Sequence, residues 1–406
     1  MEMTEEPAWL QVLSTVLMRA HLWQADQIAE TLDASMTGLG ITPTIYLVDH
    51  EQQALHALTP PDQPPFAPVP VDSSVAGRAY AQIRCLPAGD FEHPRLWVPM
   101  IDGTTRLGVI DFLLPAGRDP ASPVLQQRCG LLAGLIGHLI TTTVPRGDHL
   151  LQARRTRPMS IASELLWQLL QPLTIACDRV AVSAILQPCY DVGGDGYDYA
   201  IDANLARLSI LDGVGKGLRA GLATAVALAA LRAARRDGQD LAGQARTADT
   251  ALGEEFTDAR FVTAVLAELD MDTGVLQVLN AGHPAPLLLR AGRVVGELDG
   301  GRRTPLGVTE PHMQPAEHRL EPGDQILMYT DGITEARDAT GELFGVDRLA
   351  DLAVQHAATG LPAPEIVRRL SHAVIEHQHG PPADDATLLL AEWSPDAAHR
   401  TNPLNS

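Results

Sequence analysis

Aromatic residues are scarce in this sequence, and so are cysteines and cationic side chains. Phe, Trp and Tyr make up 4% of the 406 residues, whereas apolar residues of all kinds make up 45%. We therefore expect cores built mainly from aliphatic side chains and alanine. A chain of this length usually forms about two or three domains.

The few cysteines are widely spaced, at Cys85, Cys129, Cys177 and Cys189. Their spacing excludes a CxxC pair, so it predicts neither a disulfide framework nor a zinc site. We interpret them as small buried residues in a reducing compartment. The acidic start, residues 1–6, lacks the basic segment of a secretory signal. A cytoplasmic location is therefore predicted.

Positively charged residues are also few: the sequence has 30 Lys and Arg but 50 Asp and Glu, which gives a formal charge of −20. This balance argues against nucleic acid or an anionic membrane surface as a partner, because both attract clustered cations. The longest apolar run, residues 220–231, is too short to span a bilayer. The sequence instead favours a soluble protein that binds a cation among carboxylates.

The first third of the chain has mixed periodicity, with a proline-rich loop at 60–70. Apolar spacing predicts helices within 7–39, from 74 and over 121–142, and strands at 44–48, 96–100 and 107–112. Residues 71–79, 96–100 and 107–110 carry a resemblance to GAF-type domains. The resemblance implies a GAF-like α/β sensor or dimerisation domain over 1–143. It also implies a small-molecule or protein signal at this domain and a homodimer, although a dimerisation domain without ligand fits equally.

A linker and connecting helix are expected over 144–172, with the helix at 160–171 ended by Pro172. This helix either carries a signal between domains or simply packs. Beyond it, strands come as hairpins around turns at 202–204, 271–274 and 291–292. Such hairpins favour antiparallel sheets with helices outside them, hence an α+β class. A catalytic domain over 173–393 and a disordered tail over 394–406 are predicted.

Acidic residues recur at the ends of these strands, each beside glycine or another acid: Asp195, Asp212, Asp331 and the pair Asp384 and Asp385. Carboxylates brought close together would repel one another unless a cation neutralises them. Ligation by oxygen alone selects Mg²⁺ or Mn²⁺. Two such ions, roughly 3.5–4 Å apart, activate water against phosphorus. Asp212, with the Gly213 carbonyl, is best placed to bridge them.

The same segment resembles the metal-dependent protein phosphatases with the phosphatase 2C-like fold. The similarity is to the bacterial branch of stage II sporulation protein E-type and sigma-factor-regulating enzymes, over about 160–393. The motifs that carry it are VGGDGYD at 192–198, LDGVGKG at 211–217, FVT at 261–263, NAGHP at 280–284, PLG at 305–307, PGD at 322–324, YTDGITEA at 329–336, FG at 344–345 and DDAT at 384–387.

This resemblance implies an α-β-β-α sandwich of two antiparallel sheets flanked by helices. It implies hydrolysis of phosphoserine or phosphothreonine on a protein, typically an anti-sigma-factor antagonist, with two divalent cations, Mn or Mg. Asp195 and Asp212 would hold one ion and Asp331 and Asp384 the other. Asp212 and Gly213 would reach both, and Asp385 is the alternative to Asp384.

Two nearby residues need separate interpretation. Lys216 stands where this branch usually has His or Asn; we expect it to point to solvent, the alternative being contact with substrate phosphate. His283 is interpreted as a hydrogen-bonded turn residue and not as a general acid. The competing functions are a catalytically silent module that sequesters a signalling partner, and a metal-dependent phosphodiesterase or nuclease. The acidic balance counts against the nuclease.

Overall fold

The computed structural model describes residues 6–59, 66–188, 190–191, 193–258, 260–379 and 384–398. Five sequence features lie wholly or partly outside these ranges: residues 1–5 of the acidic start, Cys189, Val192 of the first motif, the start of the proline-rich loop and the tail from 399 onward. The chain divides after Thr156 into two compact units. Each unit has its own core, and each is described separately below.

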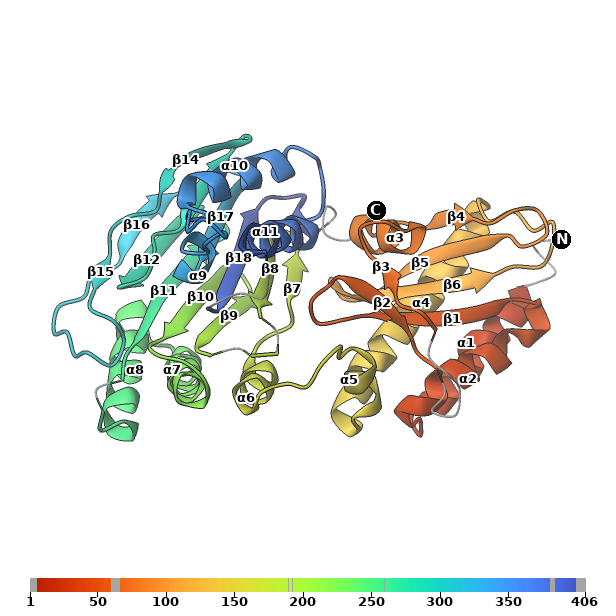
Figure 1. Ribbon diagram of the computed structural model, residues 1–406, viewed down its shortest axis with the longest axis horizontal. Coiled ribbons are helices and arrows are strands. Elements are labelled where there is room, and N and C mark those ends of the chain that lie inside the picture. The colour runs from red at the N-terminus through yellow and green to blue at the C-terminus, as the bar shows by residue number, and fades with distance from the viewer. Residues whose placement is uncertain are drawn as a thin grey trace. The chain divides into compact units, whose positions relative to one another are not determined.

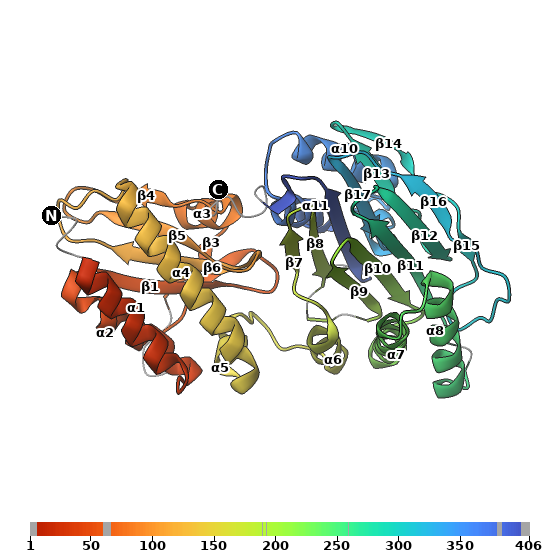
Figure 2. The ribbon, with the colours of Figure 1, turned by 180° about the vertical axis from the view of Figure 1, so that it is seen from behind.

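The N-terminal unit is built on a six-stranded antiparallel sheet in the order β3-β2-β1-β6-β5-β4. Helices α1, α2 and α4 lie on one face and α3 lies on the other (Figures 1 and 2). The helices are α1 Glu6–Ala20, α2 Ile28–Met36, α3 Val75–Gln82 and α4 Pro123–Thr143, and the strands are β1 Thr42–Val48, β2 Ala54–Ala57, β3 Val69–Pro70, β4 Leu86–Ala88, β5 Arg95–Asp102 and β6 Thr105–Leu113.

Local chemistry explains where α3 begins. The Ser74 hydroxyl accepts a hydrogen bond from the N–H of Gly77 at 2.8 Å, which caps the helix. A Cβ at position 77 would lie 1.8 Å from the Val71 carbonyl oxygen, so only glycine allows this approach. The helix predicted from residue 74 is thereby confirmed. The GAF-type assignment of the whole unit stays a prediction.

The segment between the two predicted domains contains two short helices, α5 (His149–Ala153) and α6 (Ile161–Leu169). The sequence predicted α6 but not α5. The Ser160 hydroxyl caps α6 by accepting the N–H of Ser163 at 3.1 Å. Helix α6 belongs to the C-terminal unit, where Ala162 and Leu166 lie against Gly221.

The C-terminal unit contains two six-stranded sheets. One has the order β15-β12-β11-β10-β9, with β16 also paired to β12, and the other has the order β14-β13-β17-β18-β8-β7. The only parallel pair among the described strands is β12 with β15. The strands are β7 Thr174–Cys177, β8 Val180–Gln187, β9 Asp195–Asp202, β10 Leu205–Gly213, β11 Val262–Asp270, β12 Val275–Ala281, β13 Leu287–Arg290, β14 Arg293–Glu297, β15 Arg302–Arg303, β16 Ala316–Arg319, β17 Asp324–Tyr329 and β18 Ala386–Trp393.

The two sheets pack face to face through a buried apolar core that includes Val182, Ile210 and Leu389. Helices α7 (Leu218–Arg236) and α8 (Leu241–Glu255) cover the first sheet, while α10 (Val346–Ala357) and α11 (Ala363–Gln378) cover the second (Figure 1). Alanine fills much of the layer beneath α7 and α8. The predicted α+β class, with an α-β-β-α sandwich, is therefore confirmed.

Several expectations need correction. The two- to four-residue strands β2, β3, β4, β7, β15 and β16 were not predicted, because so few residues show no period. Of the described cysteines, only Cys129 is buried, whereas Cys85 and Cys177 are half-buried. Residues 394–398, predicted as part of a disordered tail, fold back: the N–H of Ser394 donates to the Arg179 carbonyl and Ala397 is buried. Nowhere in the described chain is a helix both long and apolar enough to cross a membrane.

Candidate active site

The ends of four strands bring acidic residues to one edge of the sandwich. In the first sheet β9 begins at Asp195 and β10 ends just after Asp212, and these two residues are cross-strand partners. In the second sheet Asp331 follows the end of β17, while Asp384 and Asp385 immediately precede β18. Because β17 and β18 are antiparallel neighbours, their two loops meet at the same edge.

The carboxylates are close enough to influence one another's ionisation. Burial, and then the charges of Asp331, Asp384 and Asp385, raise the pKa of Asp212 to about 7. Burial and the charges of Asp212 and Asp385 likewise raise the pKa of Asp195. Partial burial, then Glu335 and Asp384, raise that of Asp331. The structure thus brings all the sequence-predicted acids together.

The Asp195 carboxylate is held by two threonines from the second sheet. Its Oδ2 atom accepts hydrogen bonds from the hydroxyls of Thr330 at 2.8 Å and Thr387 at 2.6 Å. The Thr330 hydroxyl also accepts the N–H of Thr387 at 2.9 Å. Sequence reasoning assigned no role to either threonine, although both lie inside the quoted motifs YTDGITEA and DDAT.

The neighbouring acids Asp384 and Asp385 have different surroundings. Asp385 is 9% exposed, and its Oδ2 accepts the backbone N–H groups of Gly193 at 2.6 Å, Gly194 at 2.5 Å and Asp195 at 3.2 Å. Asp385 therefore fixes the loop that leads into β9. The Asp384 side chain is 59% exposed and lies 3.4 Å, Oδ2 to Nζ, from Lys216. Lys216 was expected to point to solvent; its side chain is 68% exposed, and its ammonium also faces this acid.

Glycines allow the backbone segments of the site to touch. The N–H of Gly213 donates to the Gly194 carbonyl at 3.0 Å, and a Cβ on Gly194 would lie 2.4 Å from the Gly213 carbonyl oxygen. A Cβ on Gly332, next to Asp331, would lie 1.7 Å from the Asp385 carbonyl oxygen. Side chains at either position would force the acid-bearing loops apart.

The donor set suits a hard divalent cation because every donor is an oxygen, from the carboxylates and one carbonyl. The negative charges of the carboxylates also repel one another, and a cation would neutralise them. Yet across the described ranges no three His, Cys, Asp or Glu side chains are grouped tightly enough to hold an ion as they stand. The contacts explain this: Asp195 and Asp385 direct an oxygen to protein donors, and Asp384 faces Lys216. The residues fit a cation, but their side chains are not assembled around one.

His283 lies deep in the sandwich, 2% exposed, and joins the two sheets. Its Nε2–H donates to the Tyr329 carbonyl at 3.1 Å, because that oxygen can only accept. The neutral ring then accepts from the Thr263 hydroxyl through Nδ1, at 2.8 Å. Asn280 holds the His283 backbone at both its N–H and its carbonyl. This is the geometry of a turn residue that positions the end of β17.

Burial lowers the pKa of His283 to about 4, against an ordinary value of 6.5. The unfolded chain therefore binds more protons than the folded one below about pH 6.5, and stability falls as pH drops toward 4. We expect His283→Gln to lower the free energy of unfolding by about 1–3 kcal/mol at pH 7. The variant should also lack the part of the acid destabilisation that His283 causes in the natural protein, up to about 3 kcal/mol between pH 7 and pH 4. Urea unfolding of both proteins between pH 7 and pH 4 measures this; an unchanged difference across that range would contradict it.

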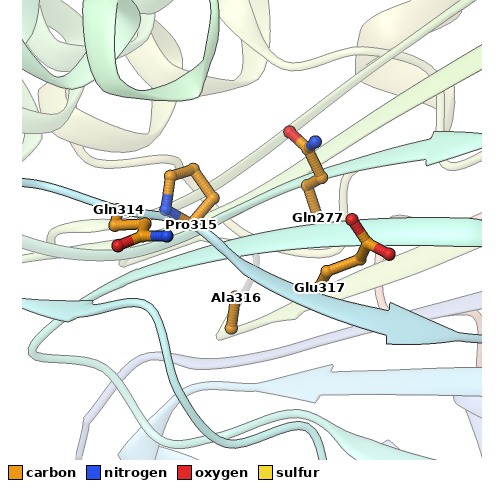
Figure 3. A pocket seen from close by; sticks show the side chains of 5 residues that line it. All are labelled: Gln277, Gln314, Pro315, Ala316 and Glu317. Atoms are coloured by element: carbon orange, nitrogen blue, oxygen red, sulfur yellow. The ribbon is translucent and has the colours of Figure 1, made fainter.

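A separate surface pocket lies away from the acids, on the outer strand β16 and its partner β12. It is lined by Gln277, Gln314, Pro315, Ala316 and Glu317 (Figure 3). Gln277 and Glu317 are cross-strand partners, so polar side chains of two neighbouring strands line this pocket. None of the predicted site residues lines it, and it contributes nothing to the chemistry of the acidic edge.

A sandwich of two antiparallel sheets, with carboxylates from both gathered at one edge, is the architecture that the resemblance to the phosphatase 2C-like class implied. Comparison with known families agrees: residues 202–394 match the model of the family described as Stage II sporulation protein E (SpoIIE). The C-terminal unit is therefore a domain of this family, and the resemblance stated for it is confirmed.

Individual relatives are more distant. The chain is similar to "Phosphoserine phosphatase RsbU" of Bacillus subtilis, with 24% identity over 215 residues, which covers 52% of this chain and 63% of that protein. It is similar to "Protein IcfG" of Synechocystis, with 26% identity over 132 residues, covering 32% of this chain and 20% of the relative. The SiaA-PP2C domain of Pseudomonas aeruginosa is 25% identical with a TM-score of 0.49, covering 57% of this chain and 94% of that one. The chain thus spans less than two thirds of these two curated relatives.

Proposed function

We propose that this protein is a Mg²⁺- or Mn²⁺-dependent phosphatase that removes phosphate from serine or threonine of a phosphorylated protein regulator. The observation that carries the proposal is the meeting of Asp195, Asp212, Asp331 and Asp384 at one edge of a SpoIIE-family domain. Their like charges raise one another's pKa, so a cation bound among them would relieve a destabilising repulsion.

Asp212 is the proposed central ligand, with the Gly213 carbonyl, Asp195, Asp331 and Asp384 around it and Asp385 as the alternative. Two divalent ions bound there would supply an activated water and a grip on the phosphoryl oxygens. Asp212 lies at the end of β10, opposite Asp195 on β9. Asp385 keeps the 193–195 loop in register through three N–H groups. Thr330 and Thr387 fix the direction of Asp195.

The name of one relative supports the proposed substrate class. One of them is named as a phosphoserine phosphatase. We propose a small phosphorylated regulator for this chain as well, of the anti-sigma-factor antagonist kind that the resemblance implies. The exposed Asp331 and Asp384 leave the acidic edge open to a protein surface.

Hydrolysis of p-nitrophenyl phosphate and of a phosphoserine protein, with Mn²⁺ or Mg²⁺ added, tests the proposal. We expect turnover that stops when a chelator removes the ion. The competing function, a silent module that sequesters a phosphorylated partner, predicts binding of that partner without release of phosphate. Absence of turnover with either ion on both substrates would overturn the phosphatase and leave the silent module.

The N-terminal unit is proposed to control activity and to join two copies of the chain. Its helical layer exposes Leu10, Leu17 and Leu131 on α1 and α4, while Gly130 and Gly134 on α4 leave room for a facing helix. An apolar, nearly uncharged face of this kind suits a second copy better than a charged partner. A small-molecule or protein signal at this unit would act through the connecting helix α6, which touches α7.

A chain beginning at residue 158 tests this control. We expect the shortened protein to be monomeric by sedimentation, and its phosphatase rate or its Mn²⁺ affinity to differ from that of the full chain. Equal rates, equal affinity and the same oligomeric state would rule out both the proposed control and the proposed dimer.

A further inference from the structure

Lys216 projects from the loop between β10 and α7 toward the acid-bearing loop of the other sheet. It is flanked by Gly215 (φ +99°) and Gly217 (φ +69°), two backbone conformations that favour glycine. Next to them, the N–H of Val214 donates to the Phe261 carbonyl at 3.2 Å. The loop is thus held beside the start of β11, and its one long side chain ends 3.4 Å from the Asp384 carboxylate.

We propose that Lys216 is a built-in counter-cation that competes with a divalent ion for Asp384. This inference rests on the proposed function, because Asp384 is a proposed ligand there. While the ammonium lies at Asp384, an ion entering beside Asp331 and Asp384 meets a positive charge as well as the two negative ones. Lys216 therefore sets how much Mn²⁺ or Mg²⁺ is needed to fill that half of the site.

Charge and exposure determine the size of the effect. The two side chains are 68% and 59% exposed, so their own ion pair contributes little to stability. An ion carries twice the charge, and a unit charge about 5 Å from it in water weakens its binding roughly tenfold. Salt screens this repulsion, so the effect shrinks as ionic strength rises.

The other cations of this loop region have different partners. Arg219 donates to Asp258 at 3.0 Å. Arg260 donates to Asp258 at 3.2 Å and to the Val214 carbonyl at 3.1 Å. Both guanidinium groups pair with Asp258 and not with Asp384. Arg219, which is 73% exposed, is therefore a matched control: a nearby cation that does not contact a proposed ligand.

Calorimetric titration of the metal-free full chain with Mn²⁺ tests the proposal without any assay of activity. At low ionic strength, about 0.01 M, we expect Lys216→Gln to bind Mn²⁺ about tenfold more tightly than the natural protein. Lys216→Arg, which keeps the charge, and Arg219→Gln should both stay within about twofold. At about 1 M salt the advantage of Lys216→Gln should largely vanish.

Asp212→Asn separates failure of this inference from failure of the proposed function. If Asp212→Asn loses Mn²⁺ binding while Lys216→Gln binds as the natural protein does, the metal site stands and the role of Lys216 falls. Equal tightening by Lys216→Gln and Lys216→Arg would also overturn that role, because charge would then not be its cause. Failure of every protein to bind Mn²⁺ would overturn both.

Discussion

Replacing Asp212 with Asn should lower phosphatase turnover by roughly 10²–10³-fold or more, the scale seen when one preorganised group of an active site is removed. Burial and the charges of three other acids raise the pKa of Asp212, which lies beside Gly213 at the end of β10. Asn keeps the shape of the side chain but removes the charge that would bind cations. Steady-state rates with Mn²⁺ added measure the loss.

The same substitution should not harm the fold. It relieves like-charge repulsion in the metal-free protein, so we expect unchanged or slightly higher stability, by up to about 1–2 kcal/mol. Thermal unfolding with and without Mn²⁺ checks this, and only the natural protein should gain stability from the ion. Near-normal turnover of Asp212→Asn would contradict its role as central ligand.

Among the glycine-to-alanine substitutions in the described part of the C-terminal unit, we expect Gly332→Ala to lower the free energy of unfolding most. The added Cβ would lie 1.7 Å from the carbonyl oxygen of Asp385, a backbone atom that no side-chain rotation can move away. We expect a loss of about 4 kcal/mol or more in the free energy of unfolding. Phosphatase turnover should fall with it, because the short helix α9 (Asp331–Thr334) and the segment that carries Asp384 could no longer lie against each other.

Gly253→Ala in α8 is the matched control. Position 253 is exposed, and a Cβ there meets nothing within 4 Å. Alanine is a better helix former than glycine, so this variant should gain about 0.5–1 kcal/mol. Urea unfolding of the two variants and the natural protein gives the comparison. If Gly332→Ala were as stable as the natural protein, the segments around Gly332 and Asp385 would be able to move apart without loss of stability, which would contradict the prediction.

The long elements of the fold could be predicted from the sequence because their apolar periods extend over several turns or residue pairs. Helix α4 and the hairpin of β9 and β10 are examples. Strands such as β15, of two residues, depend on pairing with distant strands and leave no local pattern. The meeting of the acids was also predictable, since each one lies beside glycine or another acid at a strand end.

The different structural roles of the individual acids could not be predicted from the sequence. Asp384 and Asp385 are adjacent in the sequence, yet one holds the backbone of the 193–195 loop and the other lies open beside Lys216. That difference depends on contacts across 192 positions of the chain. The threonines around Asp195 are a similar case, because one hydroxyl just after β17 and one at the start of β18 reach Asp195 only once both sheets are packed.

The hydrogen bonds from Thr330 and Thr387 to Asp195 determine which variants can test the proposed site. Asp195 is 1% exposed and fastens the first sheet to the second. A substitution of Asp195 would remove both a contact between the two sheets and a proposed metal ligand. An inactive Asp195 variant would therefore not show whether Asp195 binds a metal ion. Experiments that aim to separate catalysis from architecture should begin at Asp384, whose side chain is 59% exposed and whose pairing with the exposed Lys216 contributes little stability.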